Sequence, residues 1–228
     1  MSDFFIIGDP PIEILLRRNS KAKRYSLRIS NKDHKVSLTL PRSSNMREAK
    51  EFVSSQEGWM RKHLSRQLKP IPIKFGERIL LDGKKVFIRR GFEKVVTFNN
   101  DSLFVPGAQE DICGKLRAFY KTLARERLMA SSDYFAKLLG CKINSITLRD
   151  TTSRWGSCTS NGRLMYSWRL VMAPREVQNY VAAHEVCHLI EMNHSNEYWQ
   201  LVESVFPNYK LNRLWLKTNG NLLHQYKL

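Results

Sequence analysis

The spacing of apolar residues near the start of the chain is that of β-strands. Three segments alternate apolar and polar positions with the period of two that a strand half buried in a sheet requires. They span residues 12–18 (IEILLRR), 24–30 (RYSLRIS) and 35–41 (KVSLTLP), with turn-forming residues at 31–34 between the last two. In the second segment Tyr25, Leu27 and Ile29 share one face, opposite Arg28. The pattern predicts a small sheet whose basic residues face solvent.

A helical pattern follows at residues 43–68. Its apolar residues recur every three or four positions, as in a helix that buries one face. Ser44 or Asn45 can cap the first turn, and Pro70 and Pro72 end the helix.

Two hairpins and a long helix are predicted next. The hairpins occupy residues 78–90, with the turn at Asp82-Gly83, and residues 94–106, with the turn at 99–101. Residues 109–140 then keep the apolar spacing of one long helix that closes near Gly140.

From residue 141 onward, short strands alternate with helices. Strands are predicted at 142–150, at 153–158 and after the Asn161-Gly162 turn, and helices at 174–192, 196–206 and 211–219. Pro174 opens the first of these helices. The predicted fold class is α+β. A β-rich module with one helix, residues 1–106, packs on a C-terminal module, residues 107–228, that contains a small antiparallel sheet.

Net charge is the property that departs most from an ordinary globular protein. The 228 residues carry 38 Lys and Arg against 21 Asp and Glu, a formal net charge of +17. The densest stretch, Arg17–Lys35, holds eight basic residues and one acidic residue. Such a surface attracts polyanions, so DNA or another polyanion is an expected partner.

The remaining composition indicates a cytoplasmic protein that is not in a membrane. No run approaches the roughly 18 apolar residues of a membrane span. The first residues lack the basic region and the apolar length of a signal peptide. The four cysteines form no C-x-x-C pair, which fits a reducing compartment.

The sequence HEVCH at residues 184–188 is the strongest sign of chemistry. His184 and His188 lie one helical turn apart on one face, so both rings can reach one zinc ion. Glu185 is placed to act as the general base on an activated water without binding the metal. Apolar residues surround the motif, and buried imidazoles need partners, which a metal would provide.

A catalytic zinc requires three protein ligands and one open position. His194 is the leading third ligand, provided that the chain bends back after Met192, and Asn193 is suited to end the helix there. Glu197 and Glu203 are rivals, and Cys187 is a weaker one. A structural zinc site would fill all four positions, usually with cysteines, and would leave Glu185 without a role.

Several segments resemble the YgjP-like zinc metallopeptidases, relatives of the SprT and WLM peptidases. The matching segments are SRWGSC (153–158), SWRLVMAP (167–174), YVAAHEVCHLIEMNHS (180–195), YW (198–199) and WLK (215–217). The chain has Val186, Asn196 and Tyr198 where Leu, Pro and Phe are usual in that family.

The resemblance implies a zincin-like module whose active-site helix carries the H-E-x-x-H motif. His184, His188 and His194 would bind Zn²⁺, and Glu185 would be the catalytic base. The segments around RWGSC and LMYSWRL would form the wall of a substrate cleft. The candidate substrate-binding residues are Arg154, Trp155, Tyr166, Trp168, Arg169 and Tyr198. Among them Tyr166, Arg169 and Tyr198 are candidates to stabilise the oxyanion.

Three functions remain open at this point. The first is a zinc metalloendopeptidase, a hydrolase that acts on protein or peptide substrates. The second, suggested by the charge of Arg17–Lys35 and by the SprT and WLM relatives, is a protease that acts on DNA-bound proteins. The third is a basic binding module that holds a structural zinc.

Overall fold

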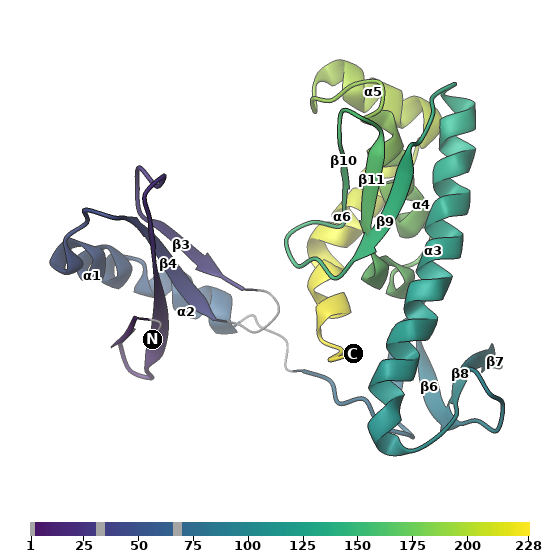
Figure 1. Ribbon diagram of the computed structural model, residues 1–228, viewed down its shortest axis with the longest axis horizontal. Coiled ribbons are helices and arrows are strands. Elements are labelled where there is room, and N and C mark those ends of the chain that lie inside the picture. Colours follow the sequence, from purple (N-terminus) through teal and green to yellow (C-terminus); the bar gives the residue numbers. More distant parts are fainter. Residues whose placement is uncertain (1–2, 31–34, 66–69) are drawn as a thin grey trace. The chain divides into compact units, whose positions relative to one another are not determined.

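The protein consists of two compact units. The computed structural model describes residues 3–30, 35–65 and 70–228, and the chain divides into unit 1, Met1–Lys69, and unit 2, Pro70–Leu228 (Figure 1). The turn expected at 31–34 lies outside the described residues. Both helices and strands are present in number, which confirms the α+β class.

Unit 1 contains a four-stranded sheet in the order β1-β2-β4-β3. Its strands are β1 (Phe4–Ile7), β2 (Ile12–Asn19), β3 (Ser26–Ile29) and β4 (Val36–Pro41). β2 and β4 run parallel, and the other two pairs are antiparallel. The three predicted segments are therefore strands, and β1 adds a fourth that the alternating pattern did not indicate.

The helix expected over 43–68 is broken in two. α1 (Met46–Ser55) is capped by Asn45, whose side chain accepts a hydrogen bond from the Arg47 amide at 2.9 Å. Gln56 then leaves the helical conformation, and α2 (Glu57–Ser65) follows. The break comes just after Ser54 and Ser55, because serine side chains compete for backbone groups; the Ser55 hydroxyl donates to the Phe52 carbonyl.

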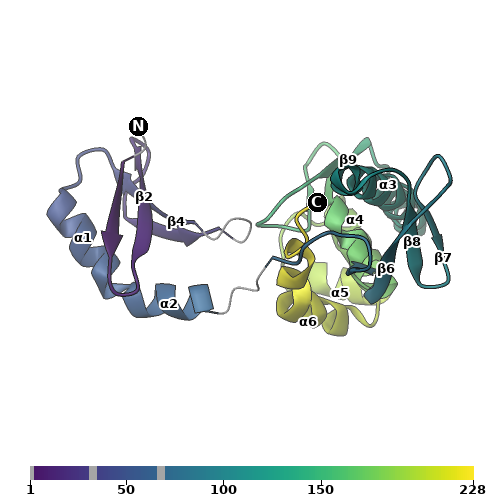
Figure 2. The same cartoon turned by 90° about the horizontal axis from the view of Figure 1, so that it is seen from below.

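Both helices of unit 1 lie on one face of its sheet (Figure 2). The core between them is formed by Ile12, Ile14, Val36, Leu38 and Leu40 from the sheet and by Ala49, Val53 and Met60 from the helices. The alternation that predicts the strands therefore also predicts which sheet face is buried.

Unit 2 begins with a second four-stranded sheet, ordered β5-β6-β8-β7. Its strands are β5 (Arg78–Leu81), β6 (Lys84–Arg90), β7 (Thr97–Asn99) and β8 (Ser102–Val105). Both predicted hairpins are present, with positive φ at Asp82 and Gly83 in one turn and at Asn100 and Asp101 in the other. Asp, Asn and Gly tolerate this backbone conformation better than other residues do.

The helix predicted over 109–140 is confirmed as α3 (Ile112–Leu138), preceded by the short helix η1 (Gln109–Asp111). Its first half packs against the β5–β8 sheet in a single core that includes Ile79, Ile88 and Leu116. The Tyr120 hydroxyl donates to the Leu80 carbonyl at 2.7 Å within this core.

The division between the units accordingly differs from the boundary expected at 106/107. Strands β5 to β8 belong to unit 2, because their apolar face is covered by α3. At the β5–β6 turn, Asp82 forms an ion pair with Arg127 of α3 and accepts a hydrogen bond from the Gln178 amide at 3.0 Å. The sequence shows each hairpin but not the element that covers it.

The third sheet, ordered β10-β11-β9, is mixed and not antiparallel as expected. Its strands are β9 (Ser145–Arg149), β10 (Gly156–Cys158) and β11 (Arg163–Ser167). β10 and β11 form an antiparallel hairpin, and β11 inserts between β10 and β9, parallel to β9. This sheet lies beside the C-terminal half of α3 (Figure 1), and β10 forms one of its edges.

Helical segments complete unit 2. They are η2 (Trp168–Met172), α4 (Arg175–Cys187), α5 (Asn196–Val205), α6 (Tyr209–Asn219) and η3 (Gly220–His224). Pro174 is the N-cap of α4 and not its first helical residue, because its carbonyl accepts bonds from the Val177 and Gln178 amides. In the described part of the chain, none of the helices combines the length and apolar character needed to cross a bilayer.

The shared core predicts which fragments of the chain fold. Residues 70–228 retain the whole core of unit 2 and should unfold in one cooperative thermal transition. Residues 107–228 lack six buried apolar side chains of β5, β6 and β8. Each is worth roughly 1.5–3 kcal/mol, and their sum is comparable with the whole stability of a domain. Circular dichroism should therefore show no cooperative melting for 107–228, and a sharp transition for that fragment would contradict this division.

Candidate metal centre and catalytic site

Helix α4 carries three of the predicted site residues. It packs inside the core of unit 2, where Ala182, Ala183 and Val186 are fully buried. His184 and His188 project from the same side of the helix one turn apart, and their ring centroids lie 5.0 Å from each other. The apolar remainder of α4 anchors the helix and so fixes both rings.

The chain turns back earlier than expected. α4 ends at Cys187 with His188 as its C-cap, whereas the sequence suggested a helix through Met192. The amides of Leu189 and Ile190 close tight turns onto the carbonyls of Val186 and Cys187. The His188 ring stabilises this turn, since its Nδ1 lies 3.0 Å from the Glu191 carbonyl. The early turn returns His194 to the helix.

Three ring nitrogens converge as a result. His194 Nε2 lies 3.2 Å from His188 Nε2 and 3.3 Å from His184 Nε2. The three histidines form a compact group of ligand atoms suited to a metal ion. A tetrahedron with Zn–N bonds near 2.05 Å has edges of about 3.3 Å, which matches the distance from His194 Nε2 to each of the other two nitrogens.

The chemistry of the three rings also fits a cation. A carbonyl only accepts hydrogen bonds, so His188 Nδ1 carries its proton and Nε2 carries a lone pair. Burial, reinforced by the neighbouring histidines, lowers the pKa of His184 to about 3, and burial also lowers the pKa of His188. Both rings are neutral at pH 7. With the lone pair on His188 Nε2, a proton on His194 Nε2 can satisfy only one of the two contacts, so at least one pair of facing nitrogens lacks a hydrogen bond unless a cation is bound.

Aromatic residues of α5 hold the imidazoles in place. The Tyr198 ring stacks on His188 with centroids 4.4 Å apart, and its hydroxyl donates to the His184 carbonyl at 2.9 Å. Trp199 stacks on His194 at 5.6 Å. The Ser195 side chain caps α5 by accepting a hydrogen bond from the Tyr198 amide, and this fixes the start of the helix that carries both rings.

A second layer supports Trp199, and sequence reasoning missed it. Tyr209 of α6 stacks behind Trp199 at 5.3 Å, and the Arg213 guanidinium lies 4.4 Å from the centre of the Trp199 ring. The positive charge of Arg213 also helps to lower the pKa of His184. The only sign of this support in the sequence is that Tyr209 and Arg213 are four residues apart and so lie on one helix face. Residues that only pack against a helix have the same spacing, so the spacing does not identify a role at the site.

Glu185 directly follows His184 on α4 and is nearly shielded from water. Its side chain is buried, and this burial raises its pKa to about 8, opposed by the positive charge of Arg154. Its carboxylate lies against Gly156, the first residue of β10; a Cβ atom at Gly156 would come within 2.4 Å of Glu185 Oε1 and 2.6 Å of its Cγ. Glycine is therefore required where the edge strand passes the carboxylate.

The alternative metal ligands do not join the cluster. Among the described residues, only His184, His188 and His194 make up a group able to hold a metal. Glu203 forms an ion pair with Lys210 instead, and Glu197 is exposed near the cap of α5. Cys187 is buried in the apolar core.

Two of the six substrate-binding candidates lie on or near an accessible surface beside Glu185. Arg154 is exposed, and its charge acts on Glu185. Trp155 is half buried and stacks on His224 with centroids 5.1 Å apart. Both precede β10 directly, so the edge strand positions them.

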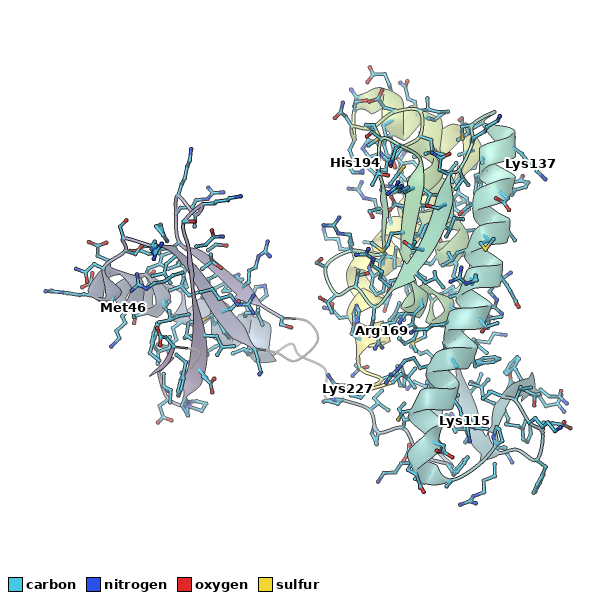
Figure 3. All side chains as sticks on the ribbon, in the orientation of Figure 1. Met46, Lys115, Lys137, Arg169, His194 and Lys227 are labelled. Carbon is cyan, nitrogen blue, oxygen red and sulfur yellow. The ribbon has the colours of Figure 1, made fainter. Side chains whose placement is uncertain are left out.

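The other four candidates are buried in the protein interior. The Tyr166 hydroxyl is paired with Ser132 at 2.9 Å, and that of Tyr198 with the His184 carbonyl. Arg169 binds Asp150 and also donates to the carbonyls of Leu223 and Tyr226, and it lies well away from His194 (Figure 3). Trp168 is 1% exposed. These four buried side chains therefore stabilise the fold. The polar groups of Tyr166, Arg169 and Tyr198 already have partners within the protein, so none of these three oxyanion candidates has a free donor directed at the site.

Comparison with known proteins agrees with this geometry. The family model of the YgjP-like metallopeptidase domain matches residues 23–219. The chain belongs to the YgjP-like family. As a YgjP-like metallopeptidase it is a metal-dependent hydrolase of peptide bonds, and its substrates are proteins or peptides.

Two further comparisons give little more. The crystal structure of the metallopeptidase zymogen of Pyrococcus abyssi abylysin is similar at 22% identity and a TM-score of 0.35, over 40% of this chain and 93% of that chain. No curated protein matches the sequence.

Alanine substitution of each histidine tests the metal centre. His184→Ala, His188→Ala and His194→Ala should each abolish tight zinc binding, because two imidazoles and an open site hold the ion far less firmly than three. In the unsubstituted chain, zinc at 100 times its dissociation constant should add about 2.7 kcal/mol to stability. Metal analysis after dialysis and thermal melting with added zinc measure both effects. His63→Ala, on the exposed side of α2, is the matched control and should behave like the parent chain.

Proposed function

We propose that this YgjP-like metallopeptidase is a zinc-dependent endopeptidase with Glu185 as its general base. One observation carries the proposal: the ring nitrogens of His184 and His188 both lie within 3.3 Å of His194 Nε2, and the residue after His184 is a buried glutamate. His184, His188 and His194 would hold the zinc, which when bound supplies Lewis acidity toward a carbonyl and lowers the pKa of water. All other chemistry is assigned to side chains of the protein.

Glu185 would move the proton. It follows His184 directly on α4, so its carboxylate stands beside the metal ligands without being one of them. Burial raises the pKa of the Glu185 carboxyl to about 8, and the charge of a bound metal ion would lower that pKa again, into the range where a carboxylate can accept a proton from the attacking water and pass it to the leaving amine. Burial is the main cause of the raised pKa, and Gly156 provides the space for the carboxylate.

The substrate would bind along β10. This strand lies at the edge of its sheet, and Gly156 brings its backbone against Glu185. An extended peptide that adds to such an edge through backbone hydrogen bonds would place one of its carbonyls beside the base. A peptide paired in this way continues past both ends of a short strand, so internal bonds are the natural target.

Arg154 is the substrate-binding candidate that this arrangement favours. It precedes β10, is exposed, and exerts its charge on Glu185. A guanidinium there would stabilise the negative charge that develops on the substrate carbonyl oxygen. Trp155, stacked on His224 beside it, would fix the course of the same segment.

The structural-zinc alternative has less support. It requires a fourth protein ligand. In the part of the chain that the structure describes, the metal-binding group consists of three histidines. This alternative also gives no reason for a buried carboxylate next to the ligands, since burying a charge without a function is costly.

Glu185→Gln separates the base from the metal. The amide keeps the size of the side chain but cannot take a proton, so zinc content should remain at the parent level while peptide hydrolysis falls by about 10²–10⁴-fold. Metal analysis and cleavage of an unfolded protein, followed by mass spectrometry, measure the two quantities on one sample. Undiminished hydrolysis by a pure variant would exclude Glu185 as the base.

Gly156→Ala tests the placement of the carboxylate by the edge strand. The new methyl group would overlap Glu185, whose side chain must then move, and a displacement of about 1 Å can cost on the order of 10² in rate. Hydrolysis should fall by roughly 10- to 100-fold with zinc still bound. The control is Gly114→Ala in α3, where a Cβ meets no atom within 4 Å. Equal activities of the two variants would show that the close approach is unimportant.

A further inference from the structure

The sheet of unit 1 has a second face that its helices do not cover. The side chains of this open face alternate with the buried ones along each strand and are Phe4, Ile6, Glu13, Leu15, Arg17, Ser26, Arg28, Ser37 and Thr39. None of them belongs to the core between sheet and helices. Phe4 and Ile6 are 56% and 59% exposed, although both are large apolar residues.

The register of the strands arranges these side chains in rows. Phe4 is paired with Leu15, Leu15 with Ser37, and Ser37 with Arg28, so one row crosses all four strands. With strands about 4.8 Å apart, the row runs about 14 Å from an aromatic ring to a guanidinium. Arg17 lies two residues along β2 from Leu15, in the next row, with Thr39 and Ser26 beside it.

Positive charge gathers on the strand side of unit 1. Arg17 and Arg28 lie on the open face, and the exposed β2–β3 connection adds Lys21, Lys23 and Arg24. Glu13 is the one carboxylate that the four described strands contribute to this face. The helices carry the balancing pairs instead, Arg47 with Glu51 and Arg61 with Glu57.

Arg17 and Arg18 are neighbours on β2, but only Arg17 lies on the open face. Arg18 points to the opposite side of β2 from Arg17, and its guanidinium donates to the carbonyls of Arg42 at 2.9 Å and Ser44 at 3.3 Å. Arg18 therefore serves the fold by fixing the segment between β4 and α1. Arg17, one position earlier, is presented to solvent by the same strand.

We propose that the open face of unit 1, centred on Phe4, Leu15, Arg17 and Arg28, binds single-stranded nucleic acid. An open sheet that offers an aromatic ring for base stacking and arginines for phosphates is a recurrent platform for unpaired strands. The hydroxyl groups of Ser26, Ser37 and Thr39 are suited to hydrogen-bond the sugar-phosphate backbone. The face would hold nucleic acid, and with it a bound protein, on the chain that carries the peptidase site.

The combination of features favours a single strand over other polyanions. A duplex hides its base faces, so an exposed Phe4 and Leu15 would have no counterpart in it. An anionic membrane would use the charge, but binding by basic patches to lipid headgroups does not depend on one aromatic ring in a row with arginines.

Fluorescence anisotropy with the full chain tests the proposal. The probes are labelled oligo(dT) and oligo(U) of about 20 nucleotides and a duplex of equal length, each in a series of salt concentrations. Single strands should bind at low salt, more tightly than the duplex, and affinity should fall steeply as salt increases. No binding of any oligonucleotide at low salt would overturn the proposal.

Substitutions locate the binding surface. Arg17→Ala with Arg28→Ala should weaken binding at least tenfold and reduce the salt slope by about 1.4, or 0.7 for each phosphate that is no longer neutralised. Phe4→Ala should weaken it about 5- to 150-fold with an unchanged slope, the range expected when one base stack is removed. The matched controls are Arg47→Ala with Lys50→Ala, on the helix side, and Phe92→Ala, a fully exposed ring in unit 2. Both controls should bind like the parent chain.

Two other outcomes would overturn the assignment. Equal losses in the Arg47/Lys50 control would show that net charge, and not the open face, attracts the strand. Binding to vesicles of phosphatidylserine and phosphatidylcholine that depends on Arg17 and Arg28, with no binding of oligonucleotides, would assign the face to a membrane. Peptidase activity on an unfolded protein should be unchanged in every variant. A failure of the nucleic-acid proposal can therefore be distinguished from a failure of the proposed peptidase function.

Discussion

Convergence of three imidazole nitrogens is the constraint around which unit 2 is arranged. His194 Nε2 lies 3.2 Å from His188 Nε2 and 3.3 Å from His184 Nε2, and without a cation at most one of these two contacts is an ordinary hydrogen bond. The packing that holds the three rings together comes from several elements. The buried face of α4 fixes two rings, the turn after Cys187 returns the third, and Tyr198 and Trp199 stack on the rings from α5. Free energy from apolar packing throughout the unit therefore preorganises a small polar cluster.

The same packing explains why Glu185, the proposed general base, and the edge strand β10 lie together. Glu185 is buried because α4 is buried, and desolvation raises its pKa toward the range in which a carboxyl group both accepts and releases protons. β10 can approach it because residue 156 has no side chain. Tyr166 and Arg169, which the sequence suggests as substrate-binding residues, instead secure the neighbouring strand and the C-terminal segment through Ser132, Asp150 and two backbone carbonyls. Polar side chains in a motif can serve the framework as much as the reaction.

Local patterns in the sequence predicted local structure well. The alternating strands, both hairpin turns and the long helix α3 were all predictable, because each depends on residues close together in the chain. The histidine spacing was predictable for the same reason. What could not be predicted was long-range: that α3 covers β5 to β8, that β11 inserts beside β9, and that Tyr209 and Arg213 support Trp199 from α6. The end of α4 was placed too late because apolar residues continue to Met192, and nothing local shows that His188 Nδ1 closes the turn onto Glu191.

Charge and chemistry are distributed differently between the two units. In unit 2, burial sets the properties of Glu185, His184 and His188, whereas the cations of unit 1 lie on an exposed sheet face and act over longer range. Salt screens exposed charges strongly and buried groups only slightly. A partner held by Arg17 and Arg28 would therefore dissociate as ionic strength rises, while the geometry around His194 and Glu185 would not change. In the proposed arrangement, ionic strength controls how tightly nucleic acid binds to unit 1 and leaves the chemistry at the metal site of unit 2 unchanged. The net charge of +17 then has a role in binding nucleic acid, which the metal site alone does not explain.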